Sequence, residues 1–395
     1  MNKNESKPHI VIETSSFDRG GLEKVVLDSA MLFRKFGYRV TIISTGTLGL
    51  LANQSRSEGI ATYGFRSRWK IVLFLMRDRP IVALSHYADF GYPVYRLLKI
   101  PNITFIHNVY AFLDSKSKKQ ILKNDRYVSR YISVSNTASL YAVKKPHLAP
   151  EKIETISNGI IVSEHIANET KARRLPILTN PKIKDKDFVF LNVASYNLHK
   201  GHYLMAAALK EVIKIYPSTK ILCIGAEVYR PHLNELKDYL QEQNLVDNMI
   251  LAGYFASPSE FYLRANCFLL PSFIEGWSIA MTEAMFYEVP MILTAVGGAP
   301  EVILKNDIGI LIPNEYGDVT NLDLELLNKL TYSPQNYQVT KILSNAMIDM
   351  IENEKKWKLQ AKVARKKVIE FHDFENIVSK YIDQINVVTK KRGKK

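Results

Sequence analysis

Short apolar runs alternate with longer helical patterns along most of this chain. Runs of this kind, often closed by glycine, proline or serine, are typical of strands buried on both faces of a parallel sheet. The predicted strands are His9–Glu13, Val40–Ser44, Ile103–His107, Tyr131–Ser135, Phe188–Ala194, Lys220–Gly225, Asn248–Gly253, Cys267–Pro271 and Pro290–Val296. Apolar residues at helical spacing predict helices at Leu22–Phe36 and Ile279–Tyr287, and a helical stretch at Tyr254–Asn266. The pattern therefore predicts an α/β protein.

The length of the chain and a change in composition predict two domains. The 395 residues are 47% hydrophobic, which is enough for two α/β cores. The apolar pattern stops near Ser163–Lys186, so we expect a first domain at 1–172 and a second at 173–365. After Asn353 a long basic helix is predicted to run on to Val388, and residues 366–395 form the terminal helix and basic tail.

The segment from Pro271 to Glu301 is the most informative part of the sequence. It follows the predicted strand Cys267–Pro271 with a glycine loop, a helix and a second strand, so its loop lies at the carboxyl edge of a parallel sheet, where such folds bind ligands. Backbone N–H groups of residues 276–278 would face an anion at the helix start. Glu275 on the loop can accept hydrogen bonds from sugar hydroxyls, and Glu283 on the helix can take both hydroxyls of a ribose. An isolated glutamate pair at this spacing is most often a solvated helix face, and the surrounding elements favour the binding site.

This segment resembles the donor-site signature of the retaining glycosyltransferases of family 4. The matching positions are Glu275, Gly276, Glu283, Ala284, Met285, Pro290, Gly297, Gly298 and Glu301. The resemblance implies the GT-B fold, in which two Rossmann-like domains face each other across a cleft and a C-terminal helix crosses back to the N-terminal domain. By the same resemblance Lys152–Ile160 is the last strand of the first domain.

Two features of the first half gain meaning from this resemblance. Gly20-Gly21 opens the first helix, and alone such a pair is simply a tight turn. In the family a Gly-Gly-x-Glu loop at this place closes over the donor phosphates. The resemblance therefore assigns this role to Gly20, Gly21 and also Glu23. His107 ends a strand, where a lone histidine is usually a structural hydrogen-bonding group. In similar enzymes a histidine after this strand lies beside the sugar.

The first loop of the second half departs from the family pattern. The family has an arginine and a Lys-Gly pair there, and both cations neutralise the leaving diphosphate. Lys200-Gly201 is present, but Ser195 stands at the arginine position and offers only a neutral hydrogen bond. Lys200 is therefore the expected main cation, although an exposed lysine at a helix start is its simplest reading.

These arguments give a complete set of expected site residues. The catalytic residues are Lys200, Glu275 and His107, and the donor-binding residues are Gly20, Gly21, Ser195, Lys200, Gly276, Trp277, Ser278 and Glu283. No metal ligand is assigned, because the sequence has no aspartate-rich motif. We expect no cofactor, since the nucleotide sugar is a substrate, and activity that does not need a metal.

The positive charge lies mainly in the first domain. The chain has a net charge of +14, and residues 1–172 hold 25 Lys and Arg against 14 Asp and Glu. Arg66–Arg79, with Trp69, Phe74 and Met76 among its basic residues, and Lys116–Arg130 are suited to an anionic membrane surface. A solvated basic face is an equal alternative. Nucleic acid is not expected as a partner, because no recognition motif accompanies the charge.

The remaining features concern location. Cys223 and Cys267 lie in predicted strands without metal-ligand spacing and are expected to be reduced core residues. No apolar run is long enough to span a bilayer, and the first residues carry no apolar signal region. We therefore expect a cytoplasmic protein, peripheral at the inner membrane face.

The expected function is transfer of a hexose or N-acetylhexosamine, with retention, from a nucleotide diphosphate sugar to a hydroxyl group. UDP is the first choice of nucleotide, and the acceptor is a glycan or a lipid-linked glycan of a cell-surface polysaccharide. Two alternatives stay open. One is a non-catalytic GT-B scaffold subunit, which Ser195 favours, and the other is a non-hydrolysing sugar-nucleotide epimerase of the same fold.

Overall fold

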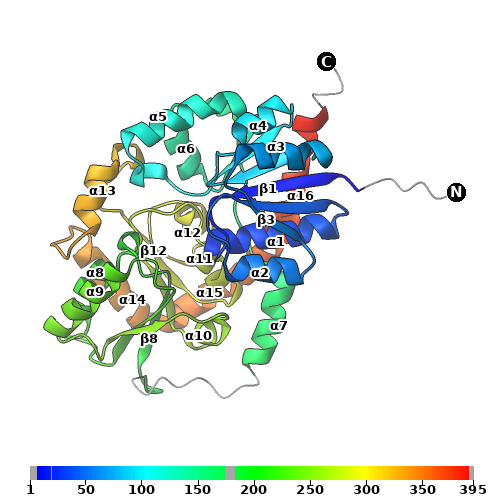
Figure 1. Cartoon of the computed structure of the whole chain (residues 1–395). Coiled ribbons are helices and arrows are strands. Elements are labelled where there is room, and N and C mark those ends of the chain that lie inside the picture. Colours follow the sequence, from blue (N-terminus) through cyan, green and yellow to red (C-terminus); the bar gives the residue numbers. More distant parts are fainter. Residues whose placement is uncertain (1–6, 19, 174–182, 391–395) are drawn as a thin grey trace. The chain divides into compact units, whose positions relative to one another are not determined.

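The structure is a computed structural model that describes residues 7–18, 20–173 and 183–390. The contacts between residues divide the chain into two compact units. Unit 1 comprises Met1–Asn108, Ser115–Ser157 and Phe374–Lys395, and unit 2 comprises Val109–Asp114 and Asn158–Asp373. The chain therefore returns to unit 1 through its last helix (Figure 1). The domain boundaries expected after residues 172 and 365 stay a prediction.

Unit 1 is built on a seven-stranded parallel sheet with the order β3-β2-β1-β4-β5-β6-β7. Its strands are β1 His9–Thr14, β2 Arg39–Ser44, β3 Ala61–Gly64, β4 Val82–His86, β5 Asn102–Ile106, β6 Arg130–Ser133 and β7 Ile153–Thr155. Its helices are α1 Gly21–Lys35, α2 Leu50–Ser57, α3 Arg68–Arg77, α4 Tyr92–Leu97, α5 Ser115–Asn124, α6 Asn136–Lys144 and α16 Phe374–Lys390. Helix α16 packs on α1, where Lys35 pairs with Glu375, and Tyr381 meets the ring of Phe105 edge-on.

Unit 2 is built on a six-stranded parallel sheet with the order β10-β9-β8-β11-β12-β13. Its strands are β8 Phe188–Val193, β9 Thr219–Ile224, β10 Met249–Gly253, β11 Cys267–Leu270, β12 Met291–Thr294 and β13 Gly309–Ile312. Its helices are α7 Val162–Ala172, α8 His202–Val212, α9 Arg230–Glu242, α10 Ser259–Arg264, α11 Ile279–Phe286, α12 Ala299–Asn306, α13 Leu324–Thr331, α14 Thr340–Glu352 and α15 Glu354–Phe371.

Both sheets reverse their strand order next to their first strand. In unit 1 the reversal lies between β1 and β4, and in unit 2 between β8 and β11. We call each of these places a switch point. The loops that leave the two strands at a switch point diverge to opposite faces of the sheet, which opens a crevice at the carboxyl edge where α/β proteins bind ligands. The fold thus selects the loops after β1, β4, β8 and β11.

The central strands are apolar because helices cover both faces of each sheet. All six residues of β1 and all four of β11 are buried. Cys223 in β9 and Cys267 in β11 are free and buried, as predicted. Among the described residues, no helix combines the length and the apolar character that crossing a bilayer requires.

Three elements are shorter than the sequence predicted. Strand β7 covers only Ile153–Thr155, and α10 covers only Ser259–Arg264. The helix expected to continue to Val388 is broken between α15 and α16. At the break the amide of Ile160 donates to the carbonyl of His372 at 3.0 Å, and Ile160 forms a parallel bridge with Asp373. A contact distant in sequence therefore interrupts the helical pattern.

Candidate functional site

The switch point of unit 2 brings together the loop after β8 and the loop after β11. Lys200 lies at the end of the first loop, and its Nζ is 2.5 Å from Oε1 of Glu275 on the second. The two side chains are 20% and 12% exposed, so the ion pair is largely shielded from water. The hydroxyl of Ser272 donates to the same carboxylate oxygen at 3.0 Å. These contacts fix a cation and a carboxylate at the crevice that the topology selects.

Three glycines allow the loops to approach so closely. Gly201 has a φ of +74°, and a Cβ there would lie 2.1 Å from the carbonyl oxygen of Pro271. Gly297 has a φ of +52°, and a Cβ there would lie 2.5 Å from the carbonyl oxygen of Gly276. A Cβ on Gly298 would strike the ring of Trp277 at 2.2 Å. The Lys200 turn and the Gly-Gly turn after β12 therefore both hold the Glu275 loop by backbone contact.

The start of α11 offers unused backbone donors beside this pair. Ser278 caps the helix, because its hydroxyl accepts from the amide of Met281 at 3.2 Å. Within the described residues, the amides of Gly276, Trp277 and Ser278 donate to no other backbone group. The side chain of Trp277 is instead buried, and its Nε1 donates to Thr282 at 3.0 Å. The backbone amide of Trp277 can therefore donate a hydrogen bond to an anion, while its ring packs within the loop.

Glu283 on α11 is held by an aromatic cluster that the sequence did not reveal. The hydroxyl of Tyr262 on α10 lies 2.9 Å from Oε2 of Glu283, and Nε2 of His165 on α7 lies 3.8 Å from Oε1. Tyr262 stacks on Tyr287 at 5.3 Å, and burial raises the pKa of Tyr262 well above its usual value. The phenol therefore stays protonated and donates to the carboxylate. No motif marks these residues, because they come from three separate helices.

The loop after β8 carries a single charge. The hydroxyl of Ser195 accepts from Nδ2 of Asn197 at 2.8 Å, so the serine orders the loop. Burial, together with the nearby Lys200, lowers the pKa of His199 to about 4. His199 is thus neutral at pH 7 and does not replace the family's arginine. Lys200 supplies the positive charge of residues 195–200.

In unit 1 the loop after β1 leads into α1 through Gly20 and Gly21. Gly20 has a φ of +147°, and a Cβ there would lie 2.4 Å from Oε2 of Glu23. The Glu23 carboxylate therefore lies over the helix start, and burial raises its pKa. Gly21 has open space where a side chain would stand. The Gly-Gly-x-Glu group is thus a compact turn with accessible backbone.

His107 follows β5 and lies against a second histidine. Its Nε2 is 2.8 Å from Nδ1 of His86, the last residue of β4, and the two rings stack at 5.0 Å. Burial lowers the pKa of His107 to about 3, so the imidazole is neutral throughout the physiological range. A neutral imidazole can exchange hydrogen bonds with a sugar hydroxyl, but it does not carry a charge to the reaction.

Unit 1 also buries a carboxyl group that sequence analysis did not single out. Glu13 in β1 accepts from the amide of Gly91 at 2.8 Å and from the hydroxyl of Tyr95 at 2.9 Å. Burial raises its pKa to about 7, although both hydrogen bonds act in the opposite direction. Its position inside an apolar strand was the only available signal. Through its hydrogen bonds to Gly91 and Tyr95, Glu13 supports the loop that follows β4.

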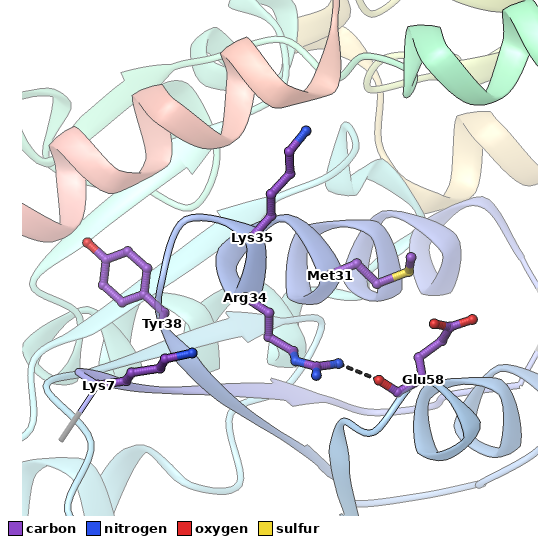
Figure 2. Close-up of a pocket in the computed structure, with 6 residues that line it drawn as sticks. All are labelled: Lys7, Met31, Arg34, Lys35, Tyr38 and Glu58. Carbon is purple, nitrogen blue, oxygen red and sulfur yellow. Dashed lines mark hydrogen bonds between the residues drawn. The ribbon is translucent and has the colours of Figure 1, made fainter. Parts of the chain in front are cut away.

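A hollow of about 310 Å³ at the other edge of the unit 1 sheet is a less suitable ligand site. Its lining residues are Lys7, Met31, Arg34, Lys35, Tyr38 and Glu58 (Figure 2). Lys7, Tyr38 and Glu58 precede β1, β2 and β3, so the hollow lies at the amino edge of the sheet. Arg34 donates to the carbonyl of Glu58, and Lys35 pairs with Glu375. Arg34 and Lys35 thus serve the fold.

The predicted site residues therefore fall into two groups. Ser195, Lys200, Glu275, Gly276, Trp277, Ser278 and Glu283 lie in unit 2, and Gly20, Gly21 and His107 lie in unit 1. The unit 2 group combines a cation and free amides, which suit a diphosphate, with two carboxylates, which suit hydroxyl groups. The unit 1 group offers the accessible backbone of Gly20 and Gly21 and the neutral imidazole of His107.

Known proteins share both the sequence pattern and the fold. A model of group 1 glycosyl transferases matches residues 177–337, and a model of glycosyltransferase family 4 matches residues 19–164. The protein named uncharacterized glycosyltransferase MJ1059 of Methanocaldococcus jannaschii is 23% identical, over 72% of this chain and 75% of its own length. The UDP-Gal:alpha-D-GlcNAc-diphosphoundecaprenol alpha-1,3-galactosyltransferase of Escherichia coli is 24% identical, over 55% of this chain and 57% of its own length.

Solved structures add the evidence for the fold. Anabaena HepE, described in complex with UDP-glucose, superposes with a TM-score of 0.76 at 15% identity, covering 96% of this chain and 99% of HepE. A likeness at this identity establishes the two-sheet GT-B fold and no more. The two family models match the two halves of the chain in turn. The chain belongs to the group 1 and family 4 glycosyltransferases and is a glycosyltransferase with the GT-B fold.

Proposed function

We propose that this protein transfers a hexose or N-acetylhexosamine from a UDP-linked sugar to a hydroxyl of a glycan or lipid-linked acceptor in cell-surface polysaccharide synthesis. The observation that carries the proposal is the Lys200–Glu275 pair at the switch point, beside the free amides at the start of α11. The E. coli relative is named for a UDP-galactose donor and a lipid diphosphate acceptor, which supports this choice. The reaction takes place at the cytoplasmic face of the membrane.

The donor is held through three kinds of contact. Glu283, oriented by Tyr262, accepts hydrogen bonds from the ribose hydroxyls. Glu275 accepts from hydroxyls of the transferred sugar, and the amides of residues 276–278 donate to the diphosphate. We assign Gly20 and Gly21 to the donor phosphates, Ser195 to a neutral contact with the donor and His107 to the sugar, on the family resemblance.

Lys200 stabilises the charge that develops when the sugar leaves. In the free enzyme its ammonium group is neutralised by Glu275 at 2.5 Å. When the donor binds, the diphosphate takes over part of this interaction, and the carboxylate turns to the sugar hydroxyls. The bond from the anomeric carbon to the phosphate oxygen breaks, the acceptor oxygen bonds to the same face of that carbon, and its proton passes to the leaving phosphate. A cation placed there lowers the barrier because it meets charge present mainly in the transition state.

Calorimetry with UDP, GDP and their hexose conjugates tests the donor site. The wild type is expected to bind one nucleotide selectively in EDTA, and Glu283→Ala should lose this binding. Exposed Glu242 on α9, which has no assigned role, provides the matched Glu242→Ala control. NMR of products formed with a glycan acceptor then identifies the transferred sugar and its anomeric configuration. Absence of binding to both nucleotides, or an inverted product, would contradict the proposal.

A non-catalytic scaffold is the second candidate function, and Ser195 favours it. The serine bonds to Asn197 within its own loop, so the diphosphate lacks the second cation of the family pattern. A scaffold would bind the nucleotide and release no transferred sugar with any acceptor. Ser195→Arg distinguishes the two functions, because a gain of transfer activity would indicate a weakened enzyme, and unchanged inactivity would favour the scaffold.

A further inference from the structure

Helix α3 of unit 1 exposes an apolar stripe. Trp69, Leu73 and Met76 are 74%, 64% and 65% exposed. Residues spaced by four and then three positions fall on one face of a helix, so these three side chains form a continuous strip. The opposite face, which includes Ile71 and Leu75, is fully buried and anchors the helix in unit 1. Water is a poor environment for such a strip, and its presence on an anchored helix indicates a partner surface.

The structure corrects the composition of this surface. The sequence analysis included Phe74, whose ring in fact lies 5.3 Å from the ring of Tyr63 and 5.6 Å from that of Phe65. Phe74 therefore packs against the end of β3. Leu73, the residue before it, is the one that points outward. Phe74 thus faces inward and Leu73 faces outward, so the short helix is apolar on both sides.

Basic side chains surround the exposed strip. The exposed members are Arg66, Arg68, Lys70, Arg77 and Arg79. Asp78 is the one acidic residue of segment 66–79, and it pairs with Arg39 of β2, so it does not neutralise them. We call these five residues, together with Trp69, Leu73 and Met76, the α3 surface. Its charge and its apolar strip occur together on one short segment.

A second basic helix borders the same loop of unit 1. Nε of Arg68 donates to the carbonyl of Phe90 at 2.9 Å, and Nδ2 of Asn124, the last residue of α5, donates to Asp89 at 2.7 Å. The loop at residues 89–90 thus accepts hydrogen bonds from both α3 and α5. Helix α5 has the sequence SKSKKQILKN and no acidic residue. The positive surface therefore extends beyond α3.

We propose that the α3 surface binds an anionic phospholipid bilayer. Tryptophan, leucine and methionine enter the boundary between head groups and acyl chains, while the flexible arginine and lysine side chains reach the lipid phosphates. Anionic lipid is the partner that satisfies both halves of the surface at once, since its phosphates pair with the charges and its hydrocarbon covers the strip. The proposal rests on the proposed function in one respect: membrane binding would bring the protein to its lipid-linked acceptor.

A cavity next to the α3 surface fits this role. It measures about 690 Å³, and Ser44 and Gly64, the last residues of β2 and β3, are part of its lining. Arg66 and Lys70 belong both to this lining and to the α3 surface. The cavity therefore opens at the carboxyl edge of the sheet, beside the surface that binds lipid. The anionic head of a membrane-bound acceptor would enter it from the bilayer.

Vesicle flotation of the full chain tests the proposal. Vesicles of phosphatidylcholine with about one third phosphatidylglycerol are compared with pure phosphatidylcholine at about 0.1 M salt, where surface charges still act over roughly 10 Å. The wild type should float only with the anionic vesicles. The triple variant Trp69→Ala, Leu73→Ala, Met76→Ala and the double variant Lys70→Glu, Arg77→Glu should each reduce binding about tenfold or more.

Helix α15 of unit 2 offers matched controls. It exposes Leu359 and Val363 beside Lys362 and Lys366, so it has charge and apolar area but belongs to the other unit. Leu359→Ala with Val363→Ala, and Lys362→Glu with Lys366→Glu, should leave flotation unchanged. An equal loss in the α15 variants would overturn the assignment to α3, as would a wild type that does not float with anionic vesicles.

Tryptophan fluorescence gives an independent readout of the same surface. The chain has three tryptophans; Trp277 and Trp357 are buried, and Trp69 is exposed. Anionic vesicles should shift the emission of Trp69 to the blue and protect it from acrylamide. Trp69→Phe should abolish the shift and still float, because phenylalanine preserves the apolar strip. Flotation without a shift in the wild type would overturn the insertion of Trp69.

These tests are separable from those of the proposed function. Flotation needs no nucleotide, and calorimetry of UDP needs no vesicle. Loss of flotation in the α3 variants with normal UDP binding supports the α3 surface and leaves the donor site intact. Failure of UDP binding with normal flotation would contradict the donor site alone.

Discussion

The two units have the same strand order at their switch points but different side-chain chemistry. At the switch point of unit 2 a shielded ion pair joins two loops, and unused amides lie beside it. Near that of unit 1, Glu13 and the stacked pair His86 and His107 are buried polar groups, and burial favours the uncharged form of each. One sheet topology can thus present a charged pair of loops in one unit and uncharged polar groups in the other. Charge changes should therefore affect catalysis mainly through unit 2.

Removal of the Lys200 ammonium group is expected to have the largest effect. Lys200→Ala should lower kcat/KM for sugar transfer by about 10²–10³-fold, because the cation meets charge that develops in the transition state. Lys200→Arg should restore part of the loss. Lys210→Ala, which removes an exposed lysine of α8 bonded to Gln243, serves as the control. A loss of less than about fivefold would mean that the Lys200 cation does not stabilise the transition state.

A pH-dependent change in the stability of unit 1 should be next in size. The pKa of Glu13 is raised from 4.5 to about 7 in the folded protein, so its contribution favours folding fully below about pH 4.5 and is lost as the pH rises through 7. At pH 8 this loss corresponds to about 3 kcal/mol relative to acidic conditions. Glu13→Gln should remove the dependence.

Hydrogen exchange of β1 in the full chain measures this effect in the correct unit. Between pH 5.5 and pH 8, after correction for intrinsic exchange, wild-type β1 should lose protection, and Glu13→Gln should not. Equal pH dependence in both proteins would show that the titration of Glu13 does not cause the loss of protection.

A smaller effect is expected from the residue that positions Glu283. Tyr262→Phe removes one hydroxyl donor to the Glu283 carboxylate and should weaken UDP binding by about fivefold to tenfold, which corresponds to about 1 kcal/mol, the usual net contribution of a single hydrogen bond. Tyr216→Phe is the matched control, because it also removes a tyrosine hydroxyl donor to a glutamate of unit 2, here Glu352 at 2.6 Å, and Glu352 has no role in the proposed site. Calorimetry should show loss in the first variant and little in the second. Equal losses would indicate a general packing effect.

Removal of divalent metal should have the smallest effect. Lys200 and the amides of residues 276–278 are expected to supply the electrostatic stabilisation of the diphosphate, so initial rates in excess EDTA should stay within about twofold of the untreated enzyme. Complete loss of activity, restored by a divalent ion, would show that the positive charge of unit 2 is insufficient.

The relation between sequence and structure differs from element to element. The strand-loop-helix-strand order of Cys267–Glu301 was predictable, because buried strands, a serine cap and a Gly-Gly turn are local signals. The break between α15 and α16 was not, since a bridge from Ile160 to Asp373 decides it. The inward position of Phe74 depends on Tyr63 and Phe65, which precede α3 by several residues. Periodicity alone does not distinguish these two sides of an apolar helix.

The sequence by itself determined the family, the α/β class and the identity of Lys200, Glu275 and Glu283 as candidate groups, because spacing along a chain carries backbone and turn chemistry. Only the tertiary structure decided how they act. It joined Lys200 to Glu275, placed Tyr262 on Glu283 and turned Trp69 outward. These are contacts between residues far apart in sequence or choices between helix faces, and packing in three dimensions settles them.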